Sequence, residues 1–279
     1  GKTALAGRVA LPPPSRRSSP GGTNLAEGGS SRPPAAVVMA HGLGLSHDCS
    51  LGPFADAFRD AGLAAVTFDY ATFGASSSGG GMPRHSVDPR AQVSDLLAAV
   101  RAVRYRADEL GVDGDRIGLW GTSLAGGHAV SAAAALAEEE EEEDAATEGA
   151  SLRRAVRAAA VLVPHMASGA EGVLATILSD PATSARGLTK ILAAFAKGAL
   201  LGLARKPWYI FLHGPPGSAA AMQNPGDDEG YGSLCAADGG EYGWRNGMTS
   251  GSLLRVLSYR PMNVASRVKV PVQMVVAEE

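Results

Sequence analysis

Short apolar runs alternate with longer segments of helical periodicity along the first part of the chain. Each run is short enough to be a strand buried on both faces of a sheet. The runs are AAVVMAHG (35–42), LAAVTFDY (63–70), RIGLW (116–120) and VRAAAVLVP (156–164), and a fifth, VKVPVQMVVAEE, covers 268–279. Alternation of strands with helices of this length predicts an α/β fold with a mostly parallel, doubly wound sheet.

Two of the intervening helices have clear boundary signals. The segment from Pro53 to Ala61 has apolar residues at helical spacing, and Gly62 stands where a C-terminal cap belongs. Asp88 is a predicted N-cap that is followed by Pro89 in the first turn. One apolar stripe then follows at Val93, Leu96, Leu97, Val100 and Val103.

Composition divides the chain into four predicted parts. Residues 1–34 hold a short strand and a flexible loop rich in Pro, Ser and Gly. The core domain covers 35–164 and carries an acidic insertion at 138–150, which is predicted to be solvated. Residues 165–268 lose the alternation and are predicted to form a helical and irregular cap. The last core strand lies in 269–279.

Overall composition excludes several classes of protein. The 279 residues are 45% hydrophobic, with 25 Lys+Arg against 28 Asp+Glu, so no basic surface for nucleic acid is expected. The longest apolar stretch, Leu188–Leu203, contains two lysines and predicts a soluble helix rather than a membrane span. Its apolar stripe is interpreted as cap core rather than a substrate slot, although it could be both, and it consists of Leu188, Ile191, Leu192 and Phe195. Cys49 and Cys235 are no disulfide framework, although one bridge between them stays open.

The most informative stretch is LWGTSLAGGH (119–128), in which Ser123 is surrounded by small residues. A sharp turn from a strand into a helix leaves no room for side chains beside the central residue. Gly121, Ala125, Gly126 and Gly127 meet that need, although Ala125 departs from the G-x-S-x-G pattern. The pattern predicts that Ser123 is a nucleophile at the end of a strand and that the N–H of Leu124 binds an oxyanion. Tight helix–sheet packing without chemistry is the alternative.

A second oxyanion donor is expected in the loop after the first long strand, MAHGLGLSHD. Gly42 and Gly44 allow the backbone to approach closely, so the N–H of Leu43 is assigned to this role, with His41 ordering the loop. The nearby His, Asp and Cys residues match no metal-ligand spacing, and no metal or cofactor is expected. Asp69, at the end of the second run, is interpreted as a loop cap rather than a catalytic acid.

These segments, in this order, resemble the α/β-hydrolases. The similarity is carried by VVMAHGLG, VTFDYATFGAS, VDGDRIGLWGTSLAGGHAV, VLVP and YRPMNVASRVKVPVQMVVAEE, and it is strongest to the group of dienelactone hydrolases, serine aminopeptidases and Xaa-Pro-peptidase-like proteins. The resemblance implies that Ser123 attacks a carbonyl carbon while Leu43 and Leu124 bind the oxyanion. One departure is that Ala71-Thr72 replace the Arg-Gly usual in the loop after the second strand.

A serine nucleophile needs a base and an acid to orient that base. In this fold both follow the nucleophile, the acid after the last run and the histidine further on. The acid is therefore expected at Glu279 or past it and the histidine past it, so the C-terminal part of the fold is expected to be missing and the 279-residue chain to be inactive by itself. His165 and His213 are the alternative bases. An uncovered sheet edge is expected to make this chain associate.

Two functions follow from these expectations. The first is a serine hydrolase that cleaves a small-molecule carboxylic ester, or an amide or peptide, through an acyl-enzyme on Ser123. The second is a catalytically inactive binding or scaffold protein on the same fold. The residues of the gene that would follow Glu279 discriminate between the two.

Overall fold

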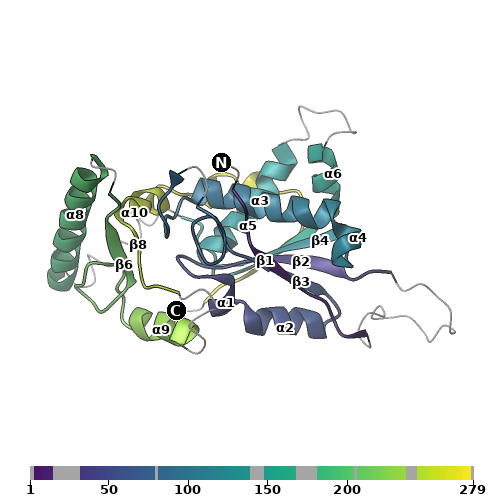
Figure 1. Cartoon of the computed structure of the whole chain (residues 1–279), viewed down its shortest axis with the longest axis horizontal. Helices are drawn as coiled ribbons and strands as arrows, with labels where there is room; N and C mark the ends of the chain where they lie inside the picture. Colours follow the sequence, from purple (N-terminus) through teal and green to yellow (C-terminus); the bar gives the residue numbers. More distant parts are fainter. Residues whose placement is uncertain are drawn as a thin grey trace.

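The chain forms an α/β core with a second lobe beside it that contains one long helix (Figure 1). In the computed structural model, the predicted acidic insertion and N-terminal loop fall mainly outside the described residues. The described ranges are 3–14, 32–78, 81–138, 148–167, 181–203, 206–236 and 244–277.

The core is built on one sheet, which has six strands in the described part of the chain. Their order across the sheet is β1-β3-β2-β4-β5-β9, and only the β1–β3 pair is antiparallel. This arrangement confirms the predicted mostly parallel α/β fold. The strands are β1 (Gly7–Ala10), β2 (Ala35–Ala40), β3 (Ala64–Phe68), β4 (Asp113–Thr122), β5 (Val156–Leu162) and β9 (Val272–Val275).

Helices cover both faces of this sheet (Figure 1). Because successive strand residues point to opposite faces, Val38 packs into one buried cluster with residues of α3 and α5, whereas Val37 and Met39 pack into another with Ala55 of α2. The core helices are α1 (His47–Ser50), α2 (Gly52–Asp60), α3 (Pro89–Tyr105), α4 (Ala107–Leu110), α5 (Leu124–Glu138) and α6 (Glu148–Ala155).

The predicted helix boundaries are confirmed for α2 and α3. Helix α2 ends at Asp60, and Gly62 follows with a φ of 85°. The carboxylate of Asp88 accepts hydrogen bonds from the backbone N–H groups of Arg90 and Ala91, as an N-cap should. On the predicted stripe of α3, Leu96, Val100 and Val103 are fully buried.

The second lobe, which we call the cap, contains strands that the sequence pattern did not predict. In it β6 pairs in parallel with β7 and antiparallel with β8. These strands are only two to five residues long, too short for a visible alternation. The cap elements are α8 (Pro181–Leu203), β6 (Tyr209–His213), β7 (Ala220–Met222), α9 (Asp227–Ala236), β8 (Met248–Thr249) and α10 (Ser250–Leu257).

Helix α8 leaves two leucines of the predicted apolar stripe exposed, whereas the side chains of Ile191 and Phe195 lie outside the described residues. Gly187 lies against Gln223, and Gly198 lies against Ser250 and Trp208, so small residues face the rest of the cap. Leu188 and Leu192 are instead exposed, Leu192 to 58%. The interpretation of these two leucines as cap core is therefore wrong, because close approach of α8 requires the glycine face to point inward.

The chain returns from the cap to the core through two short 3-10 helices, η3 (Pro261–Asn263) and η4 (Ala265–Arg267). Both pack against α5 before the chain enters β9. Strand β9 pairs with β5 on one side and forms one edge of the described sheet, with all four of its residues exposed. Among the described helices, none has the length and apolarity of a membrane span.

Candidate active site

Ser123 lies at the sharp turn between β4 and α5, where the sequence predicted it. Its φ is 53°, a left-handed conformation that is unfavourable for a residue with a side chain. Backbone contacts hold the turn, since the Ser123 N–H donates to the Leu162 carbonyl at 3.0 Å and the His165 N–H donates to the Ser123 carbonyl at 2.8 Å. The strained conformation is therefore imposed by the neighbouring strand β5 and the residues that follow it.

The small residues around Ser123 are required by direct contacts. A Cβ atom on Gly121 would lie 2.2 Å from the Ala125 carbonyl oxygen, and one on Gly127 would lie 2.3 Å from the His165 carbonyl oxygen. On Gly126 it would lie 2.7 Å from the Cβ of Pro164. No side chain fits at these three positions, as expected for a turn that presses a helix against the sheet.

The loop after β2 lies beside this turn. Since β2 and β4 are adjacent with Ala40 opposite Gly121, a Cβ on Gly42 would be only 3.5 Å from the Cβ of Ser123. His41 Nδ1 is 3.0 Å from the Gly42 carbonyl oxygen, and the carbonyl can only accept, so the ring donates. This bond orients the Gly42–Leu43 peptide group, which also carries the Leu43 N–H. Burial lowers the pKa of His41 and favours its neutral form.

Both expected oxyanion donors remain available within the described part of the chain. Leu124 is the first residue of α5, and the first N–H groups of a helix have no partner inside the helix. For the N–H groups of Leu43 and Leu124, no acceptor is found among the loop and side-chain hydrogen bonds of the described residues.

The two alternative bases make other contacts, and the Nε2 atom of each ring has no hydrogen-bond partner among the described residues. His165 stacks on Tyr259 with ring centres 6.2 Å apart, and burial lowers its pKa against a hydrogen bond with the Tyr259 backbone. His213 Nδ1 lies 2.8 Å from the Asp228 carboxylate, and its ring stacks between Tyr231 and Trp244. Neither ring makes a hydrogen bond to the Ser123 hydroxyl among the contacts of the described residues.

His128, five residues after Ser123, is fully buried in the core and does not face the serine. Its Nδ1 shares a hydrogen bond of 3.0 Å with the Tyr70 hydroxyl. Burial, with the nearby charges of His41 and His165, lowers the pKa of His128 to about 3, so the ring is neutral.

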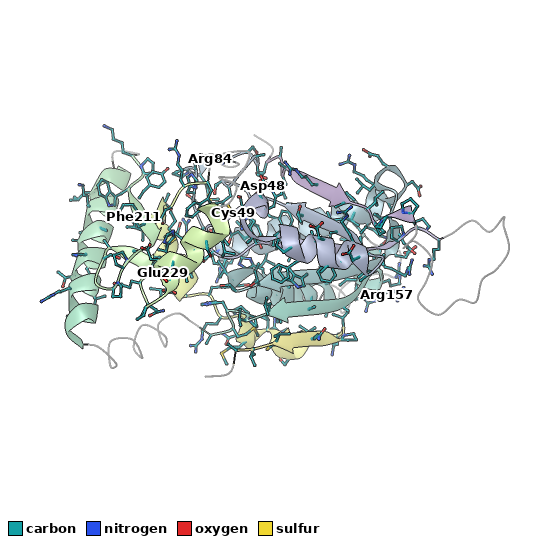
Figure 2. The ribbon with its side chains drawn as sticks, turned by 90° about the horizontal axis from the view of Figure 1, so that it is seen from below. Asp48, Cys49, Arg84, Arg157, Phe211 and Glu229 are labelled. Carbon is teal, nitrogen blue, oxygen red and sulfur yellow. The ribbon has the colours of Figure 1, made fainter. Side chains whose placement is uncertain are left out.

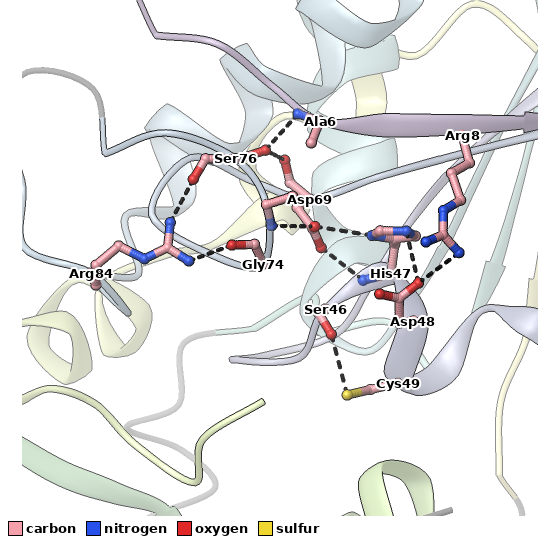
Figure 3. Close-up of polar contacts among 11 residues, drawn as sticks. Ala6, Arg8, Ser46, His47, Asp48, Cys49, Asp69, Gly74, Ser76 and Arg84 are labelled. Atoms are coloured by element: carbon pink, nitrogen blue, oxygen red, sulfur yellow. Dashed lines mark hydrogen bonds and ion pairs between the residues drawn. The ribbon is translucent and has the colours of Figure 1, made fainter. Parts of the chain in front are cut away.

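Asp69 organises the loops after β2 and β3, in agreement with its interpretation as a loop cap. Its carboxylate accepts from the backbone N–H groups of His47 at 2.9 Å and Ala75 at 3.0 Å (Figure 3). The His47 ring is 3.0 Å from Asp69 and 2.9 Å from Asp48. Burial alone would raise the pKa of Asp69, but the hydrogen bond and charge of His47, together with His41, lower it to about 2. For His47, burial acts in the opposite direction and lowers the pKa. The hydrogen bond and charge of Asp69, with the charge of Asp48, outweigh burial, so the pKa of His47 is raised overall.

Arg84 binds the loop after β3, the loop in which the expected Arg-Gly is replaced by Ala71-Thr72. Its guanidinium donates to the carbonyls of Gly74 and Ser76, both at 2.5 Å, and so closes this loop (Figure 3). Sequence reasoning missed Arg84 because it comes ten positions after Gly74, the residue that it binds, and belongs to no motif.

The cap fastens directly onto the loop that carries Leu43. The Tyr231 hydroxyl of α9 donates to the Leu43 carbonyl at 3.2 Å, and Trp244 Nε1 donates to the Gly44 carbonyl at 2.9 Å. A Cβ on Gly44, whose φ is 66°, would lie 2.7 Å from the Leu212 side chain of β6. The Leu43 loop is thus held between core and cap.

A cavity of about 510 Å³ opens between these loops and the cap. Its wall includes two arginines, an aspartate, a histidine and three aromatic side chains, a surface that suits a polar group. Ser123 does not line this cavity, and within the described residues no group of side chains is arranged to hold a metal ion. The lining residues are Leu45, Ser46, Asp48, Phe73, Gly74, Arg84, His85, Tyr209, Trp244, Arg245, Asn246 and Gly247.

Known proteins share this architecture. Residues 30–164, from just before β2 to the end of β5, match the family model BD-FAE. The crystal structure of the α/β hydrolase GrgF from Penicillium sp. sh18 superposes with a TM-score of 0.58 over 88% of this chain and 72% of that one, at 21% identity. The chain therefore has the α/β-hydrolase fold.

Two curated relatives are similar to this chain in sequence. The quorum-quenching protein AidA of Acinetobacter baumannii is 29% identical over 242 residues, which is 87% of this chain and 69% of AidA. The thiohydrolase aneE of Aspergillus aculeatus is 37% identical over 97 residues, which is 35% of this chain and 29% of aneE. The second match therefore covers less than a third of the relative's length.

Proposed function

We propose that this α/β-hydrolase is a serine hydrolase in which Ser123 attacks a carboxylic ester and becomes acylated. The observation that carries the proposal is the left-handed turn at Ser123, with a φ of 53° between β4 and α5. A strained conformation of a residue with a side chain is expensive and is typical of functional positions. Its place past the carboxyl end of a parallel strand is where such folds carry their chemistry.

The proposed oxyanion site consists of the N–H groups of Leu43 and Leu124. Leu124 begins α5, so its free N–H and the positive end of the helix dipole favour a negative charge beside Ser123. The Leu43 N–H comes from the loop whose Gly42 approaches Ser123 most closely. In the reaction, the Ser123 oxygen bonds to the carbonyl carbon, and the carbonyl oxygen gains the negative charge that these donors stabilise.

The reaction also needs a base that accepts the hydroxyl proton and returns it to the leaving group. We assign this base, and the acid that orients it, to none of the described residues. His165 and His213 are not assigned to the role, because neither ring makes a hydrogen bond to the Ser123 hydroxyl among the contacts of the described residues.

The names of the relatives guide the choice of substrates. A thiohydrolase cleaves thioesters, and the match to aneE therefore adds thioesters to carboxylic esters as substrates to test. The match to the quorum-quenching protein AidA adds quorum-sensing signal molecules. Amides and peptides complete the panel, because acyl transfer from an amide uses the same groups.

The test uses the full gene product, labelled with a fluorophosphonate probe and assayed on this panel. Label on the peptide containing Ser123 is expected, and S123A should lose both label and turnover while it keeps its melting temperature. S94A, on the exposed surface of α3, is the matched control and should behave as the wild type. Running the 279-residue chain in parallel checks the expectation that it is inactive by itself.

The alternative function is a catalytically inactive binding protein on the same fold. It is favoured by the lack of a hydrogen bond between the Ser123 hydroxyl and a described histidine. A folded full gene product that neither takes the label nor turns over any substrate would establish this alternative and exclude the hydrolase.

A further inference from the structure

Both cysteines of the chain are buried, and they come from different lobes. Cys49 lies in α1 of the core, and Cys235 lies in the last turn of α9 in the cap (Figure 2 labels Cys49 beside the cap). They are 7% and 5% exposed and belong to the same hydrophobic cluster, and both are free thiols. The proposed reaction uses neither of them.

Helix α9 presents one face to the core, and that face brings the cysteines together. Tyr231 and Cys235 are four residues apart and therefore lie on the same side of the helix. Tyr231 is anchored by its hydrogen bond of 3.2 Å to the Leu43 carbonyl. One turn later, α9 packs against α1, and Cys235 joins Cys49 in the same buried cluster.

The environment of Cys49 favours its reactive form. The Ser46 hydroxyl donates to the Cys49 sulfur at 3.2 Å (Figure 3). The hydrogen bonds from Cys235 and from Ser46 outweigh burial and lower the pKa of Cys49 to about 7, whereas the pKa of Cys235 is raised because its proton is shared with Cys49. Since the thiolate is the attacking species in thiol–disulfide exchange, Cys49 is the group that reacts first.

We propose that Cys49 and Cys235 form a reversible disulfide that ties helix α9 of the cap to helix α1 of the core. The oxidant is a small-molecule disulfide such as oxidised glutathione. The Cys49 thiolate attacks one of its sulfur atoms, forming a mixed disulfide and releasing one glutathione thiolate. The Cys235 thiol then loses its proton and attacks the Cys49 sulfur, which releases the second glutathione. The protein loses two electrons and two protons, and the oxidant becomes two thiols.

The bond would act on the cap rather than on the reacting serine. Because both thiols are buried, the oxidant reaches Cys49 when α9 lifts from α1, and the disulfide then keeps α9 in its docked position. In that position Tyr231 contacts the Leu43 carbonyl, so the oxidised chain would retain this contact.

The reduced, folded chain is equilibrated in buffers with graded ratios of reduced to oxidised glutathione, quenched in acid and analysed by intact mass and peptide mapping. Loss of two hydrogens is expected, with the Cys49 and Cys235 peptides linked within one chain. C235A is the control and should carry at most one glutathione, on Cys49. Thiols that stay free at every ratio, separate glutathione adducts on the two cysteines, or links only between chains would each overturn the proposal.

Two further measurements use the wild-type chain, so their results do not depend on whether a variant folds. The reduced wild type is treated with dibromobimane, which becomes fluorescent when it bridges two adjacent thiols, and bridging of Cys49 to Cys235 is expected. The oxidised wild type should also melt at a higher temperature than the reduced form, since the bond restricts the unfolded chain. A failure to bridge, or equal melting temperatures, would contradict the tether, and neither result depends on hydrolase activity.

Discussion

Ser123 has an energetically unfavourable backbone conformation. Contacts with the residues around it stabilise that conformation. Strand β5 and the His165 peptide group bind both backbone polar groups of Ser123. The positions of Gly121 and Gly127 have no room for a side chain. At the residue scale, the turn is therefore the most strongly specified feature of the chain.

The variants G121A and G118A test this specification on the same strand, β4. A Cβ on Gly121 would meet the Ala125 carbonyl oxygen at 2.2 Å, whereas one on Gly118 would meet Val37 at an ordinary 3.7 Å. We expect G121A to lose about 1–3 kcal/mol of unfolding free energy, as overpacked sites do. Denaturant unfolding of both variants measures this, and equal stability of G121A and G118A would contradict the close contact.

Asp69 and His47 predict a pH dependence of stability. The pKa of Asp69 is about 2 in the folded chain, compared with its ordinary value of 3.8. At pH values above 3.8 the ionised carboxylate therefore stabilises the fold by about 2 kcal/mol. This contribution is lost as the pH falls from about 4 to about 2. His47 has a pKa raised from 6.5, so its contribution is complete below about 6.5 and is lost as the pH rises through its folded pKa. Together the pair predicts greatest stability between about pH 4 and 6.5.

Removing the Asp69 carboxylate should weaken this pH dependence of stability. In D69N the loss of stability at acid pH should shrink, and the pKa of His47 should fall because its hydrogen bond and opposite charge are gone. Chemical unfolding at a series of pH values and NMR titration of His47 measure the two effects. D56N, an exposed aspartate paired only with Arg59 on α2, should leave both unchanged. An unaltered acid limb in D69N would show that other groups govern it.

At the scale of elements, Arg84 shows how a side chain from further along the chain can hold a loop. The loop after β3 lacks the usual arginine at Ala71-Thr72, yet Arg84 reaches back to bind two of its carbonyls. The guanidinium supplies two donors in a fixed plane, which a lysine cannot match.

Substitution of Arg84 should loosen this loop without unfolding the core. We expect R84A to speed amide hydrogen exchange across residues 70–78, because the carbonyls of Gly74 and Ser76 lose their donor. R84K should restore the slow exchange only in part. R90A, on the exposed side of α3, is the control and should exchange as the wild type does. Unchanged exchange in R84A would show that the loop is held by Asp69 alone.

At the scale of the whole molecule, the core sheet has an exposed apolar edge at β9. Val272, Met274 and Val275 are all exposed there, and strand edges with apolar residues pair readily with other chains. The association expected from the sequence therefore has a specific location.

A charge on this edge should reduce the association. We expect M274K to shift the chain toward the monomer, because an edge lysine must lose its hydration to be covered. L254K, on the surface of α10, is a matched control, since Leu254 is 60% exposed and Met274 is 46% exposed. Sedimentation velocity at several concentrations compares the variants. A wild-type chain that is monomeric throughout, or an equal effect of both lysines, would exclude β9 as the contact.

The fold and the turn at Ser123 could be predicted because their signals are local. An apolar run, an Asp-Pro cap or a glycine beside a serine acts within one strand or one turn, so the pattern is readable over a few residues. The cap strands were missed because each is too short for periodicity. The interpretation of Leu188 and Leu192 failed because apolar spacing does not tell which face of a helix will be covered.

What the sequence determined by itself is the order of the core strands and helices, the caps of α2 and α3, and the tight turn at Ser123. Only the tertiary structure decided that Arg84 closes the β3 loop, that Tyr231 and Trp244 hold the Leu43 loop, and that Cys49 meets Cys235. The physical reason is that these contacts join segments far apart along the chain. Their existence depends on the path of the whole backbone and on the packing of cap against core, which no local pattern encodes.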